Sequence, residues 1–420
     1  MKRLTILILL LLVSTTVMAQ KVCKIEGKII DRPDDKILWL APNNTDYRVV
    51  DPIEIEIRKD GTFSYDMEFE HSQLYCLVFK SEVERSYFYS YHFLLEDGTV
   101  SFEIYNEDKY KDRKIEGGKL NKQFHYIDVE IGKKYSKKLE PLYEKLSNNE
   151  QNNVYSQEFL IWIEEIQQEG LSIELRDSLY AVRNYLDDNN MVYNEAGKAL
   201  KAEIDEYESA IESEQWAEIS KEANEATLAS LNRQVNANSY YANLALNTKH
   251  KELLYKNFSK KYSDNPMYQQ IEIDVLGNEI KEGSDFIDFE APDLEGNMHK
   301  LSDLIKGKVV VLDLWASWCG PCMRTTKSFI PVWEKYKDRG FDIVGVAREN
   351  NNTTAMEAAI ERIGMEWLNL VELNDRAEVW AKYAAGNGGG KVILIDSKGK
   401  IVAMGFKATE LEEHLEKLLK

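Results

Sequence analysis

The chain has 420 residues, 44% of them hydrophobic, so it can fill more than one core and is expected to form two or three domains. Its 72 acidic residues outnumber the 53 lysines and arginines, which gives a formal charge of -19 at pH 7. An acidic surface of this size repels phosphate backbones, and no basic cluster follows the first few residues, so nucleic-acid binding is not expected.

Residues 1–19 have the layout of a secretory signal peptide. A basic pair, Lys2-Arg3, precedes an apolar run over residues 4–13, and Ala19 ends a small-residue cleavage site. The run is short for a bilayer span of roughly 20 residues, although an uncleaved anchor is the alternative. No other segment of the sequence is apolar enough to cross a membrane. We therefore expect an exported protein of the periplasm or cell envelope that is soluble once this leader is removed.

Residues 20–118 consist of short runs in which apolar and polar residues alternate, which predicts an antiparallel β-sandwich. The stretch "PIEIEIRKDGTFSYDMEF" turns at Asp60-Gly61, and "RSYFYSYHFLLEDGTVSFEIY" turns at Asp97-Gly98. An Asp-Gly pair between two alternating runs is a strong hairpin signal, so each stretch predicts a hairpin.

Two sets of side chains in this region leave alternatives open. An aromatic row on one face of a predicted strand favours cross-strand packing over ligand binding. It consists of Tyr87, Tyr89, Tyr91 and Phe93. Cys23 and Cys76 each lie in a strand-like run. In an exported protein they can form a disulfide, or they can be two small buried hydrophobic residues.

Residues 119–275 are poor in proline and glycine and rich in Glu, Lys, Ala and Leu, which predicts a helical region. A 4-3-4 spacing puts one apolar stripe on a charged helix at Leu200, Ile204, Tyr207 and Ile211. The runs "FLIWIEEI" and "HKELLYKNF" have a similar character. The charged faces are expected to be solvated, and we assign no chemistry to them.

Residues 276–420 follow the βαβ-like order of an α/β domain. The run "KVVVLDLWA" is nearly all apolar, as a central strand buried on both faces should be. A helix is expected after Cys322, then the strand "FDIVGVA" and a helix around "TAMEAAIERIG". The stretch "KVILIDSKGKIVAMGF" predicts a hairpin that turns at Lys398-Gly399, and a final helix follows it.

Cys319 and Cys322 stand at the predicted strand-to-helix junction. Free N–H groups and the helix dipole favour the thiolate of Cys319 there, so this residue can attack a substrate disulfide. Cys322, one turn later and expected to be better buried, can then resolve the mixed disulfide. Pro321 fits the first turn because it needs no hydrogen-bond donor there.

The alternatives for this pair are a zinc half-site and an inert disulfide. A structural zinc site needs four ligands, whereas the six histidines are scattered singly along the sequence and no second Cys-x-x-Cys pair exists. We therefore expect a redox-active Cys319–Cys322 disulfide with no other cofactor and no bound metal.

Asp313 lies six residues before Cys319, inside the apolar strand. A carboxylate on a buried strand is costly unless it serves a function. We expect it beneath the cysteines, with a pKa raised by desolvation, where it can exchange a proton with Cys322. The alternative is an aspartate that points to solvent near a strand end.

Residues 284–420 resemble the exported thioredoxin-like thiol–disulfide oxidoreductases of the TlpA/ResA type. The matching stretches are "APDLEG" (291–296), "LSDLIKGKVVVLDLWASWCGPC" (301–322), "EKYKDRGFDIVGVA" (334–347) and "LIDSKGKI" (394–401). The resemblance implies a thioredoxin-like fold, with Asp313 as the buried aspartate and Gly320-Pro321 as the dipeptide of reducing members. The preceding regions resemble, more weakly, the accessory region of some bacterial relatives.

The chain departs from this family pattern at two positions. Gly390 stands where the family has a cis-proline, and a cis bond before a non-proline residue costs roughly 2.5–4 kcal/mol, so we expect a trans loop. In the family this loop binds the substrate backbone, and Trp318, Gly389 and Gly390 are the expected substrate contacts. Thr325 stands where ResA-type members often have a glutamate, so Asp313 is expected to act alone or with water. Capture of a metal by the unscreened cysteines is a further alternative.

The sequence therefore predicts an enzyme that reduces disulfides of cell-envelope proteins and receives electrons from a membrane donor. One alternative is a non-catalytic binding or scaffold protein whose function lies in the first two regions. A thiol peroxidase is less favoured, because that chemistry needs a threonine three residues before the reactive cysteine, and Ala316 stands there.

Overall fold

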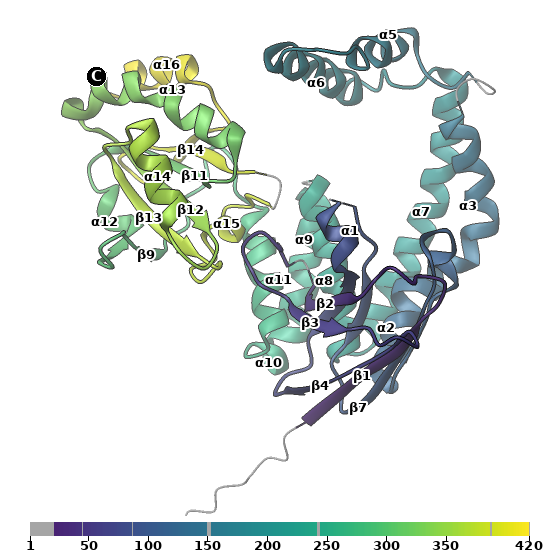
Figure 1. Ribbon diagram of the computed structural model, residues 1–420. Coiled ribbons are helices and arrows are strands. Elements are labelled where there is room, and N and C mark those ends of the chain that lie inside the picture. Colours follow the sequence, from purple (N-terminus) through teal and green to yellow (C-terminus); the bar gives the residue numbers. More distant parts are fainter. Residues whose placement is uncertain are drawn as a thin grey trace, which may run out of the picture.

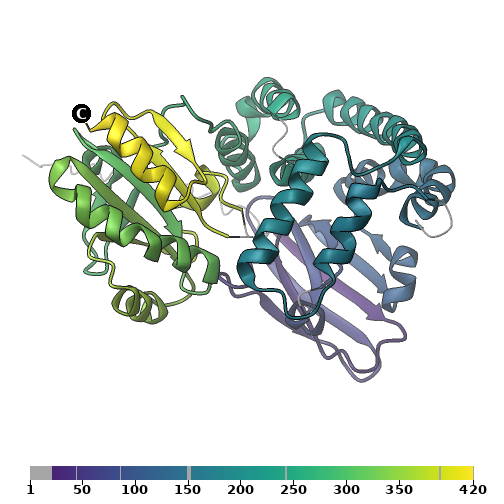
Figure 2. The same cartoon turned by 90° about the horizontal axis from the view of Figure 1, so that it is seen from above.

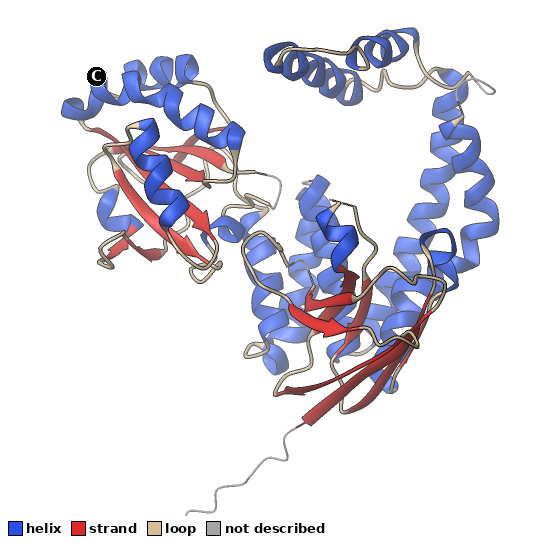
Figure 3. Ribbon diagram, viewed as in Figure 1, coloured by secondary structure: helices blue, strands red, loops and turns tan. Residues whose placement is uncertain are grey.

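A computed structural model of the chain describes residues 21–43, 45–85, 87–148, 153–241, 244–386 and 389–419. The predicted signal peptide lies outside the described residues. Figures 1 and 3 show three parts in chain order: two β-sheets, a set of helices and a C-terminal α/β domain. This is the architecture that the sequence predicts.

The N-terminal part contains two four-stranded sheets that face each other. The strands are β1 (Lys21–Ile29), β2 (Ile37–Pro42), β3 (Ile53–Glu56), β4 (Thr62–Phe69), β5 (Leu74–Phe79), β6 (Tyr91–Leu94), β7 (Gly98–Ile104) and β8 (Lys114–Glu116), with helix α1 (Lys80–Glu84) and a 3-10 segment (Glu107–Asp112). The sheet orders are β4-β1-β7-β8 and β3-β2-β5-β6. Side chains of both sheets, such as Ile25 and Leu77, share one buried cluster. The predicted sandwich is confirmed, although it is not wholly antiparallel, since β1 and β7 run parallel.

Both predicted Asp-Gly turns occur, but neither joins a hairpin. Gly61 and Gly98 take φ angles of 82° and 114°, which glycine adopts without steric cost. However, β3 pairs with β2 and β4 with β1, while β6 pairs with β5 and β7 with β1 and β8. The two strands at each turn therefore lie in different sheets, and the hairpin prediction is wrong. Alternation fixes which face of a strand is buried, but it does not fix which strand lies beside it.

The aromatic row is divided by the start of β6 at Tyr91. Tyr91 and Phe93 are buried in the cluster between the sheets, whereas Tyr87 precedes the strand and is 61% exposed. Tyr89 stacks on Tyr110, with 4.1 Å between the ring centroids. The buried members of the row therefore serve packing, which is the interpretation that the sequence favours.

Cys23 and Cys76 are free, buried thiols rather than a disulfide. Cys23 lies in the cluster between the two sheets. In β5, Tyr75 and Leu77 point into that cluster, so Cys76 between them points to the opposite face, where the Tyr47 hydroxyl lies 3.6 Å from its sulfur. The sheet separates the two sulfurs, and the disulfide alternative does not hold.

The middle part is helical, as predicted. Its elements are α2 (Lys119–His125), a π-helical turn (Tyr126–Glu130), α3 (Ile131–Ser147), α5 (Gln157–Ile166), α6 (Ile173–Asp188), α7 (Glu195–Lys221), α8 (Glu225–Tyr241), α9 (Leu244–Leu253), a second π-helical turn (Leu254–Phe258), α10 (Ser259–Tyr262) and α11 (Pro266–Gly277). The predicted apolar stripe of α7 packs on α3. Helices α3 and α7 form a long pair with α5 and α6 beyond its end, whereas α8 and α11 lie beside the sheets (Figures 1 and 2). The helices therefore do not form one bundle.

The C-terminal domain is built on a five-stranded sheet in the order β13-β12-β11-β14-β15. Its strands are β11 (Val309–Trp315), β12 (Phe341–Glu349), β13 (Leu368–Leu373), β14 (Lys391–Ile395) and β15 (Ile401–Met404), and β9 (Glu290–Pro292) pairs with β10 (Met298–Lys300) beside them. Its helices are α12 (Leu301–Leu304), α13 (Gly320–Tyr336), α14 (Thr354–Ile363), α15 (Val379–Lys382) and α16 (Ala408–Leu418), with a 3-10 turn at Lys337–Arg339. All of β11 is buried, as predicted for a central strand, and β14 and β15 form the predicted hairpin.

Helix α11 connects the helical part to the C-terminal domain by direct packing. A Cβ atom at Gly277 would lie 2.5 Å from the carbonyl oxygen of Ala381 in α15, so only glycine permits this approach. The contact holds the C-terminal domain against the first two parts. Among the helices of the described ranges, none is long and apolar enough to cross a bilayer.

Candidate active site

Strand β11 and helix α13 position the two cysteines. Cys319 caps the N-terminus of α13, and the backbone N–H of Cys322 donates to the Cys319 sulfur at 3.2 Å. The two sulfurs form a disulfide, with 5.3 Å between the Cα atoms. Pro321 occupies the first turn, where no N–H donor is needed. Because the helix dipole and free N–H groups point at Cys319, this position stabilises its thiolate after reduction.

The prediction that Cys322 is the better buried cysteine is wrong. Cys319 is only 6% exposed, whereas Cys322 is partly exposed. Cys319 packs in a cluster with Trp380 and Ala385, and the Trp318 ring lies against the same cluster. Trp380 comes from α15, so the cover over Cys319 depends on tertiary packing that the Cys-x-x-Cys spacing does not show.

Asp313 lies inside β11 and is 1% exposed, which excludes the solvent-facing alternative. Burial raises the pKa of Asp313 to about 7, and a hydrogen bond from Thr326 acts in the opposite direction. The Thr326 hydroxyl lies 2.7 Å from Asp313 Oδ2 and 3.0 Å from the carbonyl oxygen of Cys322. Because a hydroxyl has one proton, it donates to Asp313 when that carboxylate is ionised, and it can donate to the carbonyl when Asp313 is protonated.

Sequence reasoning missed Thr326. The available signal was its spacing, because a residue four positions after Cys322 lies on the same face of α13. The neighbouring Thr325, at the position where the family has a glutamate, is not the residue that contacts Asp313.

Gly390 stands directly against the cysteines. The described residues contain no cis peptide bond, so the bond between Gly389 and Gly390 is trans, as predicted for a loop without proline. The Gly390 N–H donates to the Cys322 sulfur at 3.1 Å, a hydrogen bond that proline cannot make. A Cβ atom at Gly389 would lie 3.9 Å from the Cys319 sulfur. The neighbouring Gly388 lies outside the described residues.

Replacing Gly390 with alanine is expected to destabilise the domain by about 3 kcal/mol. A Cβ atom here would lie 1.8 Å from the Leu314 carbonyl oxygen and 3.0 Å from the Cys322 sulfur. Leu314 pairs with Lys391, so relief of this clash must displace β14 from the central strand. Urea unfolding measures the loss. The matched control is Gly386→Ala, where a Cβ atom meets nothing within 4 Å; equal stability of the two variants would contradict the account.

Trp318 contacts the N-terminal part of the chain. The Arg48 guanidinium lies 4.1 Å from the centroid of the Trp318 ring, a cation–π distance. The ring centroids of Trp318 and Trp380 lie 5.9 Å apart, and the Arg348 guanidinium lies 5.2 Å from the centroid of the Trp380 ring. The predicted substrate contact Trp318 is therefore also part of the contact between domains.

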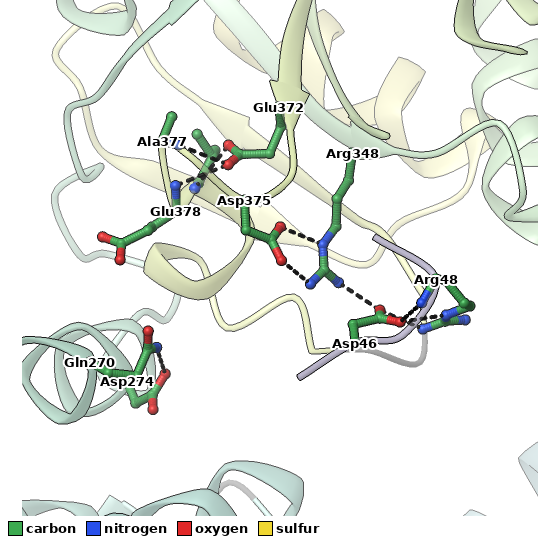
Figure 4. A network of polar contacts seen from close by, with 10 residues as sticks. Asp46, Arg48, Gln270, Asp274, Arg348, Glu372, Asp375, Ala377 and Glu378 are labelled. Carbon is green, nitrogen blue, oxygen red and sulfur yellow. Dashed lines mark hydrogen bonds and ion pairs between the residues drawn. The ribbon is translucent and has the colours of Figure 1, made fainter. Parts of the chain in front are cut away.

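Arg348 is the centre of an ion-pair network between the domains (Figure 4). Its guanidinium donates to both carboxylate oxygens of Asp375 at 2.6 and 2.5 Å. It also donates to Asp46 Oδ2 at 3.1 Å. Asp46 also accepts hydrogen bonds from the backbone and side chain of Arg48. Burial acts to raise the pKa of Asp46, but the hydrogen bonds from Arg48 and the charge of Arg348 hold it below its usual value. Since Arg348 and Asp46 are both buried, loss of either would leave an uncompensated charge.

Two further buried carboxylates fix the loops around the cysteines. Glu349 accepts hydrogen bonds from the backbone N–H and the hydroxyl of Ser317, both at 2.6 Å. Glu372 accepts from backbone N–H groups at the start of α15, including those of Ala377 and Val379. Burial raises the pKa of both carboxyl groups. The sequence signal that was missed is the pair Arg348-Glu349, which puts two charges at the end of an apolar strand.

Two regions of the chain match known families. Residues 283–404 match the AhpC/TSA family, and residues 23–124 match a domain of unknown function, DUF4369. The first region contains the cysteine pair, Asp313 and Gly390, whereas the second contains the two facing sheets.

Several proteins are similar to part of this chain. The thiol-disulfide oxidoreductase ResA of Geobacillus kaustophilus is 31% identical over 139 residues, which are 32% of this chain and 77% of that protein. ResA of Geobacillus thermodenitrificans is 30% identical over 139 residues, with the same shares of 32% and 77%. Among solved structures, the thioredoxin domain of a thiol-disulfide oxidoreductase from Bacteroides vulgatus is 30% identical, covers 34% of this chain and 99% of that chain, and has a TM-score of 0.31.

Proposed function

Since this chain belongs to the ResA family of thiol-disulfide oxidoreductases, we propose that it is an exported enzyme that reduces disulfides of cell-envelope proteins through Cys319 and Cys322. The observation that carries this proposal is the position of Cys319 at the N-terminus of α13, with Cys322 bonded to it. In the reduced enzyme, the Cys319 thiolate attacks one sulfur of the substrate disulfide. That S–S bond breaks, a mixed disulfide forms, and the released substrate thiolate takes a proton.

Cys322 completes the reaction. Its thiolate attacks the Cys319 sulfur, which breaks the mixed disulfide, releases the second substrate thiol and forms the Cys319–Cys322 disulfide. The Gly390 N–H at 3.1 Å stabilises the Cys322 thiolate as it forms. Two electrons pass to the substrate, so a dithiol donor must reduce the enzyme again. For an exported enzyme we propose a donor in the membrane.

Asp313 is the proposed proton acceptor for Cys322. Burial raises its pKa to about 7, so it can hold or release a proton near neutral pH. It takes the proton of the Cys322 thiol directly or through a water molecule as that residue becomes the attacking thiolate. Thr326 donates to the ionised carboxylate at 2.7 Å before this transfer, and once Asp313 is protonated the hydroxyl can donate to the carbonyl oxygen of Cys322 instead.

The location of the enzyme is proposed from its leader sequence. Residues 1–19 have the charge and hydrophobicity pattern of a signal peptide. Export would bring the enzyme into a compartment where disulfides persist, which is where a disulfide reductase has substrates.

A redox titration of the chain against a dithiol/disulfide buffer tests the proposed function. We expect a reversible two-electron couple at Cys319 and Cys322, with a slope of about 30 mV per tenfold change in the thiol/disulfide ratio. Thiol labelling and mass measurement report the state of each cysteine, while the buried Cys23 and Cys76 label only after unfolding. A pair that does not cycle would favour the alternative of a non-catalytic binding or scaffold protein.

Thiol peroxidase activity is the second candidate, because residues 283–404 match the AhpC/TSA family. The residue three positions before Cys319 is Ala316, which is buried and offers no hydroxyl group to a bound peroxide. We therefore propose disulfide reduction as the activity. Consumption of peroxide with a dithiol donor, faster than reduction of a disulfide, would instead favour the thiol peroxidase.

A further inference from the structure

A cavity of about 870 Å³ lies where the three parts of the chain meet, beside the cysteine pair. We call it the interdomain cavity. Its walls include Asn43 of the N-terminal part, Asn232 of α8, Gln270 of α11, and Gly389 and Gly390 of the C-terminal domain. Its volume lies within the range of about 300–1,000 Å³ that holds drug-sized ligands. The cavity therefore suits a short segment of a substrate rather than a whole domain.

The two glycines bring the cavity to the reacting sulfurs. The Gly390 N–H lies 3.1 Å from the Cys322 sulfur, and a Cβ atom at Gly389 would lie 3.9 Å from the Cys319 sulfur. Both glycines also line the cavity. A substrate whose disulfide reaches Cys319 can therefore extend its neighbouring residues into this space.

The polar lining matches the hydrogen-bonding groups of a polypeptide backbone. Seven of the lining side chains are carboxamides, and each of these has both donors and acceptors, as a peptide group does. The Nδ2 atoms of Asn43 and Asn236 both donate to Asn232 Oδ1 at 3.0 Å, so the carboxamides already orient one another. Each of these two NH2 groups has a second N–H for a bound peptide, whereas Asn232 Oδ1 already accepts two hydrogen bonds.

The charge of the cavity is unbalanced near α11. Four acidic side chains line it against two basic ones. Arg348 binds Asp46 and Asp375, as described above, so these charges are compensated within the protein. Lys391 also lines the cavity, and Glu378 lies 3.9 Å from Lys382, so the acidic lining residue without a basic partner is Asp274: among the described residues no lysine or arginine lies within ion-pair distance of it.

Asp274 is half-buried and lines the cavity. Its carboxylate accepts a hydrogen bond from Gln270 at 3.0 Å, and these two residues lie apart from the Arg348 network (Figure 4). Burial raises the pKa of Asp274 to about 7, and the charge of Glu378 acts in the same direction. A cation bound here would compensate the charge of this carboxylate.

We propose that the interdomain cavity binds the extended polypeptide segment next to the substrate disulfide, with a lysine or arginine side chain placed against Asp274. The inference rests on the proposed function and names the class of substrate: a disulfide flanked by a basic residue in an unfolded or exposed segment. The carboxamides bind the backbone of this segment, and Asp274 selects its charge.

The test compares three substrates with the whole chain. Two are disulfide-linked peptides that differ only in one residue beside the cysteine, lysine in one and glutamine in the other. The third is bis(2-hydroxyethyl) disulfide, which is too small to span the cavity. For the wild-type protein we expect kcat/KM to favour the lysine peptide by about tenfold, the size of one charge-assisted hydrogen bond.

Asp274→Asn is the decisive variant, because asparagine keeps the shape and can still accept from Gln270. We expect it to reduce the two peptides at nearly equal rates and to reduce the small disulfide as the wild type does. Asp338→Asn is the matched control, since Asp338 is exposed at the far end of α13 and should leave the peptide preference unchanged.

The outcomes separate the two proposals. If the wild type reduces none of the three substrates, the proposed function fails. If it reduces all three but shows no lysine preference, or if Asp274→Asn keeps the preference, the role of the interdomain cavity is wrong while the reductase function stands.

Discussion

Replacing Cys319 with serine is expected to lower disulfide reduction by about a thousandfold or more, because the attacking sulfur is lost. The hydroxyl of serine is not ionised near neutral pH, even at a helix N-terminus, so it cannot replace the thiolate. Reduction of bis(2-hydroxyethyl) disulfide, followed with a dithiol donor, measures the effect. The fold should be retained, since the Cys319–Cys322 disulfide closes a loop of only a few residues.

Cys322→Ser is the companion variant, with a different expected result. Cys319 can still attack, but nothing resolves the mixed disulfide, so a covalent adduct with the substrate should accumulate and appear in non-reducing mass measurements. Cys23→Ala is the control, because it removes a thiol that lies between the two sheets, away from the cysteine pair. Full activity of Cys319→Ser in disulfide reduction would rule out Cys319 as the attacking sulfur.

Replacing Asp313 with asparagine is expected to stabilise the protein at pH 8 by up to about 4 kcal/mol. Burial raises the pKa of Asp313 from 3.8 to about 7 in the folded protein. Between these pH values the folded state holds a proton that the unfolded state has released, so the wild-type free energy of unfolding falls as pH rises through this window. Asparagine does not titrate. The gain in the free energy of unfolding of the variant over the wild type should therefore vanish near pH 4 and be complete above pH 7.

Urea unfolding at several pH values measures this dependence. The same variant should slow disulfide reduction, because the proton acceptor proposed for Cys322 is lost. Thr326→Val provides a second test: without the hydrogen bond that lowers the pKa of Asp313, the destabilisation of the wild type at high pH should increase. If Asp313→Asn is no more stable than the wild type at pH 8, the pKa of Asp313 is not raised in the folded protein.

The sequence was sufficient for features that depend on neighbours along the chain. The apolar run over β11 predicted a central strand, and the Cys-Gly-Pro-Cys stretch predicted a pair at the start of a helix. Asp313 was identified because a charge inside such a run is unusual, and the structure places it at 1% exposure. Gly390 was identified by alignment on the strand that follows it, and its trans bond follows from the absence of proline. In each case a few adjacent residues fix the local conformation.

The tertiary structure decided everything that depends on which distant segments meet. The Asp-Gly turns at Gly61 and Gly98 were predictable, but the partners of the adjoining strands were not, because alternation is equally compatible with a hairpin and with a crossing between sheets. The burial of Cys319 beside Trp380, the binding of Asp46 by Arg348 and the position of Asp274 at the interdomain cavity also join remote parts of the chain. Sequence periodicity records which side of an element is apolar, whereas side-chain contacts across domains depend on how complete surfaces pack together.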